Sequence, residues 1–312
     1  MARYPQRSAA RSALRRSRGF IVLAVLWIVA ALSGLVLIYL NFVTTTAIAV
    51  GGAGDRVQSE ALLTAAVELS ALQLTEAKGE APRPTSGVFG ASVGAAKIAV
   101  TFRSEASRVD LNAAPKPLLA GLFTGIGVPP ADADAYADRI VAWRAPVKPS
   151  DDDPETSFYR NSGLTYAPRH GPFPAVEELW LVHGIPSPLI ERVLPLVTVY
   201  GNGAAVNVMD APPQVIAALP GMTPERLQAI LTQRSDPRAD PRTVQTLAGT
   251  AGGTAAATLA YRLGIEATLD NGRRSAAEVV ILILEDADQP YRVLSWRNRF
   301  DGDAAQQEVT AR

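Results

Sequence analysis

The longest uncharged stretch of this sequence decides its architecture. No residue from position 19 to 54 carries a charge, and residues 20–40 (FIVLAVLWIVAALSGLVLIYL) are almost wholly apolar. An α-helix rises 1.5 Å per residue, so about twenty such residues span the roughly 30 Å hydrocarbon core of a bilayer. We therefore expect a transmembrane helix over residues 20–42.

The residues before this stretch set its expected orientation. Residues 1–18 hold six arginines and no acid. Cationic flanks stay in the cytoplasm, which places the rest of the chain across the membrane. Two alternatives compete: a buried core helix, which would normally show polar positions, and a cleaved secretory signal ending near Ala47-Ile48-Ala49. The apolar run is longer than the roughly 7–15 residues of an ordinary signal core.

The composition of the remainder excludes several kinds of site. The chain has no cysteine, which excludes thiolate chemistry, Cys-ligated metals and disulfides. With only two histidines, His170 and His183, it cannot build a multi-histidine metal site. Without its first 18 residues the chain carries 24 basic and 30 acidic side chains. A mildly acidic body does not favour a polyanionic partner.

The periodicity of the remaining sequence predicts an α+β fold. Residues 97–102, 260–269, 278–284 and 291–297 alternate as strands, with a tight turn at Asp270-Asn271-Gly272. Between the first strand and the others, residues 112–250 follow helical patterns. The predicted architecture is a long N-terminal membrane helix and a small antiparallel sheet, with a large α-helical domain inserted into that sheet.

Smaller features complete this expectation. An apolar stripe predicts a helix through residues 56–77 that packs on the sheet, formed by Leu62, Ala65, Ala66, Leu69 and Leu72. Three glycines before it (Gly51, Gly52 and Gly54) predict a weak or bent point. Residues 79–94 have the Pro/Gly/Ser composition of a loop, and residues 173–185 predict a helix that ends at Gly184.

The helical region contains internal echoes. Residues 109–115 (VDLNAAP) and 206–212 (VNVMDAP) each carry an Asn or Asp and an early proline before a predicted helix. Residues 182–186 and 219–225 resemble helix-hairpin-helix turns, which hold a phosphate in nucleic-acid-binding proteins. Residues 112–250 carry 11 basic and 14 acidic side chains, so we interpret these turns as structural and expect no nucleic-acid partner.

The junction at residues 16–23 (RSRGFIVL) resembles the class III signal of type IV prepilins. The resemblance implies that a membrane peptidase cuts between Gly19 and Phe20 and that the new N-terminus is methylated. Most pilins have glutamate at the fifth mature position, where this chain has Ala24. That glutamate neutralises the terminal amine of the preceding subunit. In a subunit without a predecessor, the glutamate would have no amine to neutralise, and burying its carboxylate would only cost desolvation free energy.

The body is similar to general secretion pathway protein K, the minor pseudopilin K family of bacterial type II secretion. The segments that carry this resemblance occur in the family's order: DLNAAPKPLLAGLF, IVAWR, GPFPAVEELWLVHGI, PLVTVYG, VNVMDAPPQVIAALPGMT and YRVLSWR. It implies a pilin-like core with an inserted α-domain, located at the tip of the pseudopilus. The implied partners are the I- and J-type minor pseudopilins, the major pseudopilin, the prepilin peptidase and secreted substrates.

The resemblance also fixes the expected organisation and location. We expect a basic leader over residues 1–19, the membrane helix over 20–42, and the lower helix with the first strands over 43–111. The inserted helical domain follows over 112–250 and the last strands over 251–312. The chain would be a single-pass inner-membrane protein with a cytoplasmic N-terminus and a periplasmic body.

One loop suggests a metal. Residues 151–155 (DDDPE) place Asp151, Asp152, Asp153 and Glu155 in a Pro/Ser-rich segment, and hard carboxylate oxygens suit Ca²⁺. A solvated charge run is the alternative. Protein K resembles this arrangement in having an acidic calcium loop after a tryptophan-containing helix, here residues 140–144.

No catalytic constellation stands out, so we expect a structural protein. The rival classes are a membrane-anchored enzyme and a periplasmic DNA-binding or DNA-uptake module.

Overall fold

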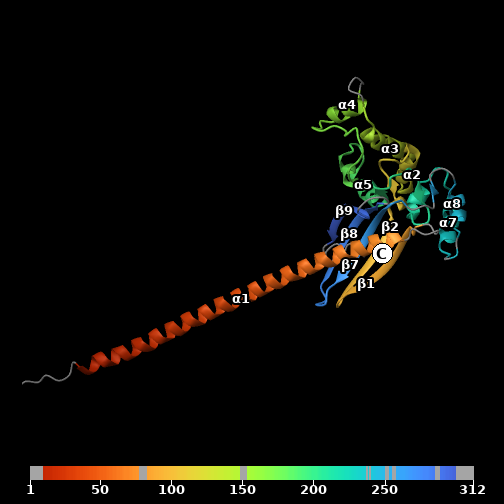
Figure 1. Cartoon of the computed structure of the whole chain (residues 1–312). Coiled ribbons are helices and arrows are strands. Elements are labelled where there is room, and N and C mark those ends of the chain that lie inside the picture. The colour runs from red at the N-terminus through yellow and green to blue at the C-terminus, as the bar shows by residue number, and fades with distance from the viewer. Residues whose placement is uncertain are drawn as a thin grey trace, which may run out of the picture. The chain divides into compact units, whose positions relative to one another are not determined.

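The computed structural model describes residues 10–76, 83–147, 153–236, 238, 240–249, 253–254, 258–284 and 289–299. The chain divides into two units, Met1–Glu60 and Ala61–Arg312. Helix α1 (Ala10–Glu76) begins in the first unit and ends in the second (Figure 1). Its side chains are described for residues 22–43 and 54–76.

The helix of the first unit is uninterrupted. It continues through Gly51, Gly52 and Gly54, where the sequence suggested a weak or bent point. The glycines therefore do not break the helix. Each glycine costs a helix about 1 kcal/mol relative to alanine. Strong helix formers on both sides, Ala47 and Ala49 before the glycines and Glu60, Ala61 and Leu62 after them, offset this local cost.

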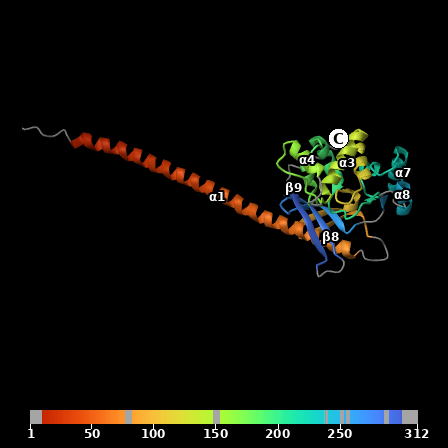
Figure 2. The ribbon, with the colours of Figure 1, turned by 90° about the horizontal axis from the view of Figure 1, so that it is seen from above.

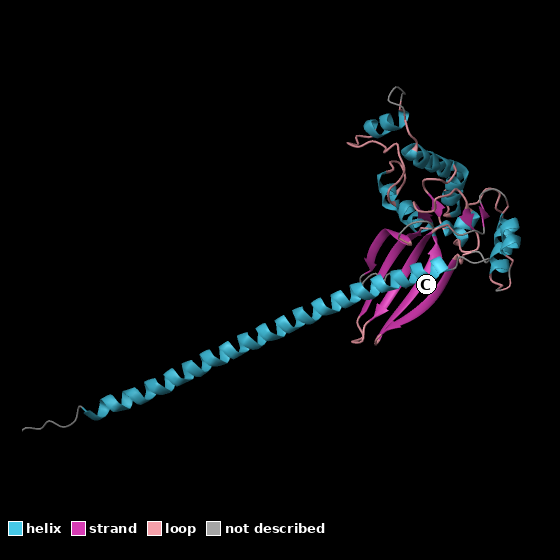
Figure 3. Ribbon diagram, viewed as in Figure 1, coloured by secondary structure: helices cyan, strands magenta, loops and turns pink. Residues whose placement is uncertain are grey.

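The second unit contains a five-stranded antiparallel sheet in the order β1-β2-β7-β8-β9 (Figure 3). Its strands are β1 (Ser86–Val93), β2 (Ala96–Ser104), β7 (Ala260–Thr268), β8 (Arg274–Ile283) and β9 (Tyr291–Arg299). Four of the five strands match the predicted runs. The predicted turn joins β7 to β8, with Gly272 at φ 80°.

Strand β1 corrects the sequence analysis, which placed a loop over residues 79–94. Its glycines and serines gave no strand signal, because Gly weakens a strand and leaves no side chain to pack. One of these glycines is required by its partner strand. A Cβ at Gly87 would lie 2.5 Å from the Phe102 ring on β2. The tertiary contact therefore decides the structure of this segment.

The C-terminal part of α1 packs on one face of this sheet and contributes to its core. Its buried residues are Leu62, Leu63, Ala66, Val67, Ser70, Ala71 and Leu74. The predicted stripe is partly wrong, since Leu69 and Leu72 are 37% and 54% exposed. Ser70 belongs to the buried face instead. Its hydroxyl donates to the Ala66 carbonyl at 2.6 Å and so needs no other partner.

A helical region is inserted between β2 and β7 and gathers at one end of the sheet (Figures 1 and 2). Its helices are η1 (Glu105–Ser107), α2 (Lys116–Gly125), α3 (Pro130–Arg144), α4 (Pro154–Asn161), η2 (Val176–Leu181), α5 (Ser187–Val193), η3 (Leu194–Leu196), α6 (Pro213–Ala217), α7 (Pro224–Arg234) and α8 (Pro241–Ala248). Two short parallel pairs join β3 (Val109–Asp110) to β4 (Val197–Thr198) and β5 (Val206–Asn207) to β6 (Gly253–Thr254). This region has its own hydrophobic core.

One helix of this region differs from its prediction. Residues 173–185 do not form an α-helix, because only Val176–Leu181 are helical and they form a 3₁₀-helix. Its bonds are of the i→i+3 kind, from the amide of Glu178 to the carbonyl of Ala175 and from Val182 to Leu179. The chain then turns at Gly184, with φ 90°, as the sequence suggested.

The two sequence echoes are built in the same way. After β3, the Asp110 carboxylate accepts the Asn112 amide at 2.8 Å, and after β5 the Asn207 side chain accepts the Met209 amide at 2.9 Å. In each echo, the arginine that ends the second helix then donates to carbonyls of this turn. Arg144 donates to the carbonyls of Leu111 and Ala114, and Arg234 to those of Val208 and Ala211. The two segments therefore share one strand–turn–helix–helix construction.

Candidate functional sites

The membrane segment is the first candidate site. Among the described residues, one helical stretch is long and apolar enough to cross a bilayer, Val22–Val43, with a mean hydropathy of 2.6. It overlaps the predicted span of residues 20–42. Gly19 and Phe20 lie in α1 just before it, and Ala24 lies in its first turn. Cleavage between Gly19 and Phe20 stays a prediction.

The acidic loop is the second candidate site, and part of it lies outside the described residues, including Asp151 and Asp152. Asp153 caps α4, since its Oδ1 accepts the Glu155 amide at 3.1 Å. Its Oδ2 lies 2.9 Å from His170 Nε2. Desolvation acts against ionisation, but hydrogen bonds with Thr156 and the nearby His170 leave the pKa of Asp153 below its usual value. Both oxygens of Asp153 thus have protein partners.

Glu155 retains an unpaired oxygen. Its Oε2 lies 2.6 Å from Arg139 Nη1, whereas its buried Oε1 has no hydrogen-bond partner among the described residues. An orphaned carboxylate oxygen fits one ligand of a calcium site, which needs 6–8 oxygens. The described residues hold no group of three His, Cys, Asp or Glu that could bind a metal. Glu155 therefore fits Ca²⁺ only together with ligands from residues 148–152.

An aromatic cluster lies between α3 and α4. Trp143 and Tyr159 are buried with ring centroids 5.9 Å apart, and Trp143 stacks on Phe173 at 6.2 Å. The hydroxyl of Tyr159 accepts the His183 amide at 2.7 Å. Burial raises the pKa of Tyr159 to about 12. His170 and His183 therefore serve as packing and hydrogen-bonding residues here.

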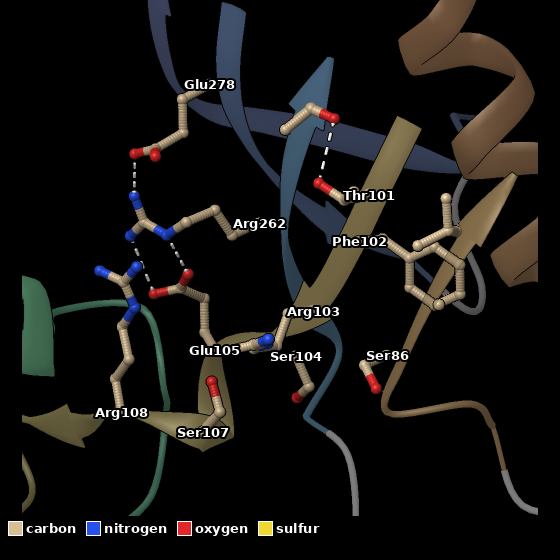
Figure 4. Close-up of a pocket in the computed structure, with 13 residues that line it drawn as sticks. Ser86, Thr101, Phe102, Arg103, Ser104, Glu105, Ser107, Arg108, Arg262 and Glu278 are labelled. Atoms are coloured by element: carbon tan, nitrogen blue, oxygen red, sulfur yellow. Dashed lines mark hydrogen bonds and ion pairs between the residues drawn. The ribbon is translucent and has the colours of Figure 1, made fainter. Parts of the chain in front are cut away.

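A polar pocket of about 390 Å³ is the third candidate, and sequence reasoning missed it. It lies where the helical region leaves the sheet, and Figure 4 shows its lining side chains. Arg262 on β7 bridges two carboxylates, with its Nε 2.7 Å from Glu105 Oε1 and its Nη1 bonded to Glu278. Glu105 is 1% exposed and also accepts the Thr198 hydroxyl.

The same pocket contains two further arginines. Burial and the neighbouring Arg262 lower the pKa of Arg108, opposed by Glu105 and Glu278. Neither Arg103 nor Arg108 forms an ion pair within the part of the chain that the structure describes. No local sequence pattern predicts this cluster, because its members come from positions 103–108, 262 and 278.

The second glycine turn is held by hydrogen bonds within the chain. At the second turn, Gly221 has φ 74° and its carbonyl accepts Arg226 Nη1 at 3.3 Å. The start of α7 is capped internally, because Thr223 accepts the Arg226 amide at 3.3 Å. The nearby cation and the helix terminus thus have intramolecular partners, which agrees with the structural interpretation.

Comparisons with known proteins agree with the resemblance. Residues 100–202 match the family model described as type II secretion system, protein K. A chain of the solved GspK–GspI–GspJ complex from the type 2 secretion system of enterotoxigenic Escherichia coli has the same fold, with a TM-score of 0.55 at 18% identity. The match covers 78% of this chain and 95% of that chain. No curated protein sequence matches the chain significantly.

These findings confirm the fold class: a long N-terminal apolar helix, an antiparallel sheet and an inserted helical region. The helical region begins directly after β2, so the matched residues 100–202 cover the end of that strand and the first half of the insertion. The resemblance inferred from the sequence is confirmed, since residues 100–202 match the protein K family model of the type II secretion system.

Proposed function

We propose that this chain is a minor pseudopilin of the type II secretion system that occupies the tip of the pseudopilus and initiates its assembly. One observation carries the proposal. A membrane-length apolar helix continues without a break into the core of a head whose residues 100–202 match the protein K family model. A subunit of this form assembles through its helix and needs no catalytic site.

The partners follow from the same proposal. The structurally similar chain was solved in a complex of GspK, GspI and GspJ. We infer that this chain likewise associates with I- and J-type minor pseudopilins and, below them, with the major pseudopilin. Prepilin peptidase would process it at the inner membrane, and secreted proteins would contact the assembled pseudopilus in the periplasm.

The position of the insertion favours a capping role. The helical region gathers at the end of the sheet formed by Ser86, Arg103 and Arg262 (Figure 3). Such added bulk at one end of a head is compatible with a subunit that has nothing stacked beyond it. It supports the tip assignment, which the absence of a carboxylate at Ala24 also favours.

Mass spectrometry of the mature N-terminus tests the proposal. We expect a methylated Phe20 in membranes that contain prepilin peptidase, and no processing of a Gly19→Trp variant. An N-terminus near Val50 would instead identify a secretory signal peptide. Protein that keeps Met1 in the presence of active peptidase would also contradict the pseudopilin assignment.

Calcium is proposed as a structural ligand of the acidic loop. Glu155, with its free oxygen, supports this proposal, and Asp151 and Asp152 would supply further ligands. Asp153 would then position the loop by capping α4, instead of giving both oxygens to the metal. The bound ion would tie residues 148–152 to the start of α4 and to the aromatic cluster.

A further inference from the structure

The two edges of the five-stranded sheet differ in their protection. Strand β9 carries Arg292, Arg297 and Arg299, and its register with β8 shifts between Val280 and Ile281. Charged side chains and register irregularities discourage pairing with other strands. Strand β1 (SGVFGASV) has no charge and no proline, and all eight residues pair regularly with β2. The β1 edge therefore lacks the usual devices that block strand addition.

The outer side of β1 is also accessible. In the described part of the chain, β2 is the one strand that pairs with β1. Val88, in the middle of β1, is 75% exposed. Unpaired backbone groups along an edge strand can bind an extended segment of another chain through main-chain hydrogen bonds.

Two hollows lie beside this edge. The pocket described above includes Ser86, Gly87 and Val88 in its wall, and a second of about 400 Å³ includes Gly90, Ala91 and Ser92. The small side chains of β1 leave this space open. Alternate side chains of an added strand point to the same face of a sheet, so they could enter such hollows in succession.

Charge indicates which side chain the first hollow would accept. Arg103 lies directly opposite Ser86 in the sheet register, is exposed, and forms no ion pair among the described residues. Asp210 accepts the Ser86 hydroxyl at 2.6 Å but does not pair with Arg103. A strand added beyond β1 would lie about 10 Å from β2, within the combined reach of an arginine and a carboxylate side chain.

We propose that β1 pairs with an extended strand from another pseudopilin head, and that an acidic side chain of this strand binds Arg103. This inference rests on the proposed function. Heads held by helices in one membrane meet at a high effective concentration, so a weak edge contact suffices. A second copy of this chain fits poorly, because β1 contains no carboxylate to meet Arg103.

Site-specific cross-linking in membranes tests the pairing. A photo-reactive amino acid replaces Val88 in the full-length chain, co-expressed with the other minor and major pseudopilins. Its counterpart at Val293, 42% exposed on β9, is the matched control. We expect an adduct between the Val88 variant and one pseudopilin, identified by mass, and at least about fivefold less from Val293, because β9 is the protected edge.

Charge reversal tests the role of Arg103. Arg103→Glu should weaken co-purification with the cross-linked pseudopilin about tenfold, while Arg292→Glu on β9 should leave it unchanged. Equal effects of the two variants, or a Val88 adduct only with a secreted protein or a second copy, would overturn the inference. A chain that co-purifies with the other pseudopilins but gives no Val88 adduct refutes the β1 contact alone. Absence of co-purification by the wild type refutes the proposed function itself.

Discussion

Single residues hold the inserted region on the sheet. Glu105 is buried, receives hydrogen bonds from Thr198 and Arg262, and lies at the point where the chain leaves β2. Ser104, its neighbour, accepts the Thr258 amide at 3.0 Å where the chain returns toward β7. The exit and the return of the insertion are therefore fastened together by polar contacts whose members are far apart in sequence.

Removing the charge of Glu105 should destabilise the head. Glu105→Gln leaves Arg262 with Glu278 alone and should lower the free energy of unfolding by roughly 2–3 kcal/mol, since a broken buried pair strands a charge. Glu177→Gln is the control, because its partner Arg297 is 52% exposed and such pairs contribute about 1 kcal/mol or less. Denaturant unfolding followed by circular dichroism compares them. Similar losses in both variants would show that the Glu105 cluster is not a structural fastening.

Calcium binding should depend on Glu155. If the acidic loop binds the ion only when folded, calcium raises the melting temperature of the wild type and a chelator lowers it. Glu155→Gln should show the same melting temperature with and without calcium, whatever its own stability without Arg139 pairing. Magnesium serves as the matched cation. If calorimetry detects no heat of calcium binding and a chelator does not change the melting temperature, the acidic loop does not bind calcium and is simply solvated.

At the scale of elements, the sequence predicted those whose pattern is local. Strands β2 and β7 alternate buried and more exposed residues, because one face packs on α1, and β8 ends in the apolar run Val279–Ile283. The sequence carries no signal for β1, because its Gly87 fits against Phe102 on another strand. The 3₁₀-helix η2 was taken for an α-helix, since periodicity does not separate the two over one or two turns.

The candidate sites divide in the same way. Asp153-Pro154-Glu155 is a local helix-start pattern, so the capping role of Asp153 was within reach of the sequence. The contact between Asp153 and His170 could not be predicted, because the loop between α4 and η2 brings these two residues together. The Glu105–Arg262 pair joins positions 157 residues apart and has no sequence signal.

The tie between β9 and α1 through Tyr291 should weaken at alkaline pH. The Tyr291 hydroxyl donates to Glu68 Oε1 at 2.8 Å, and partial burial with this bond raises the pKa of Tyr291 to about 12. A raised pKa means that the folded state favours the protonated phenol. Its contribution is complete below the unfolded tyrosine pKa of about 10 and is lost as the pH rises toward 12.

Comparison with Tyr291→Phe isolates this effect. The variant should be less stable by about 0.5–1 kcal/mol near neutral pH and should lose less stability than the wild type between about pH 10 and 12. Tyr159, whose pKa is also raised to about 12, contributes equally in both proteins. Urea unfolding across this range gives the difference. Parallel curves for the two proteins would contradict the Tyr291–Glu68 tie.

At the scale of the whole molecule, one helix serves two environments. Its residues from Val22 to Val43 are apolar and exposed, while those from Leu62 to Leu74 form part of the head's own core. The head therefore cannot unfold from the helix without exposing its sheet.

Ala24 tests where in the filament this subunit sits. A carboxylate inside a helix bundle is tolerated only beside a cation, and pilins use the amine of the preceding subunit. If the chain is the first subunit, Ala24→Glu finds no amine, pays the desolvation cost, and should bring no gain in secretion and weaker co-purification with the other minor pseudopilins. Ala24→Gln, which is of the same size but uncharged, separates charge from bulk.

A shaft position predicts the opposite result. There, Ala24→Glu would supply a missing partner to the amine below and should leave incorporation unchanged or improve it. Secretion of a reporter substrate and labelling of the wild-type chain along sheared pseudopili measure both alternatives. Labels confined to one end, together with an impaired Ala24→Glu, support the tip assignment. Labels along the whole length would refute it, because a subunit without the glutamate would then be packing repeatedly against unneutralised amines.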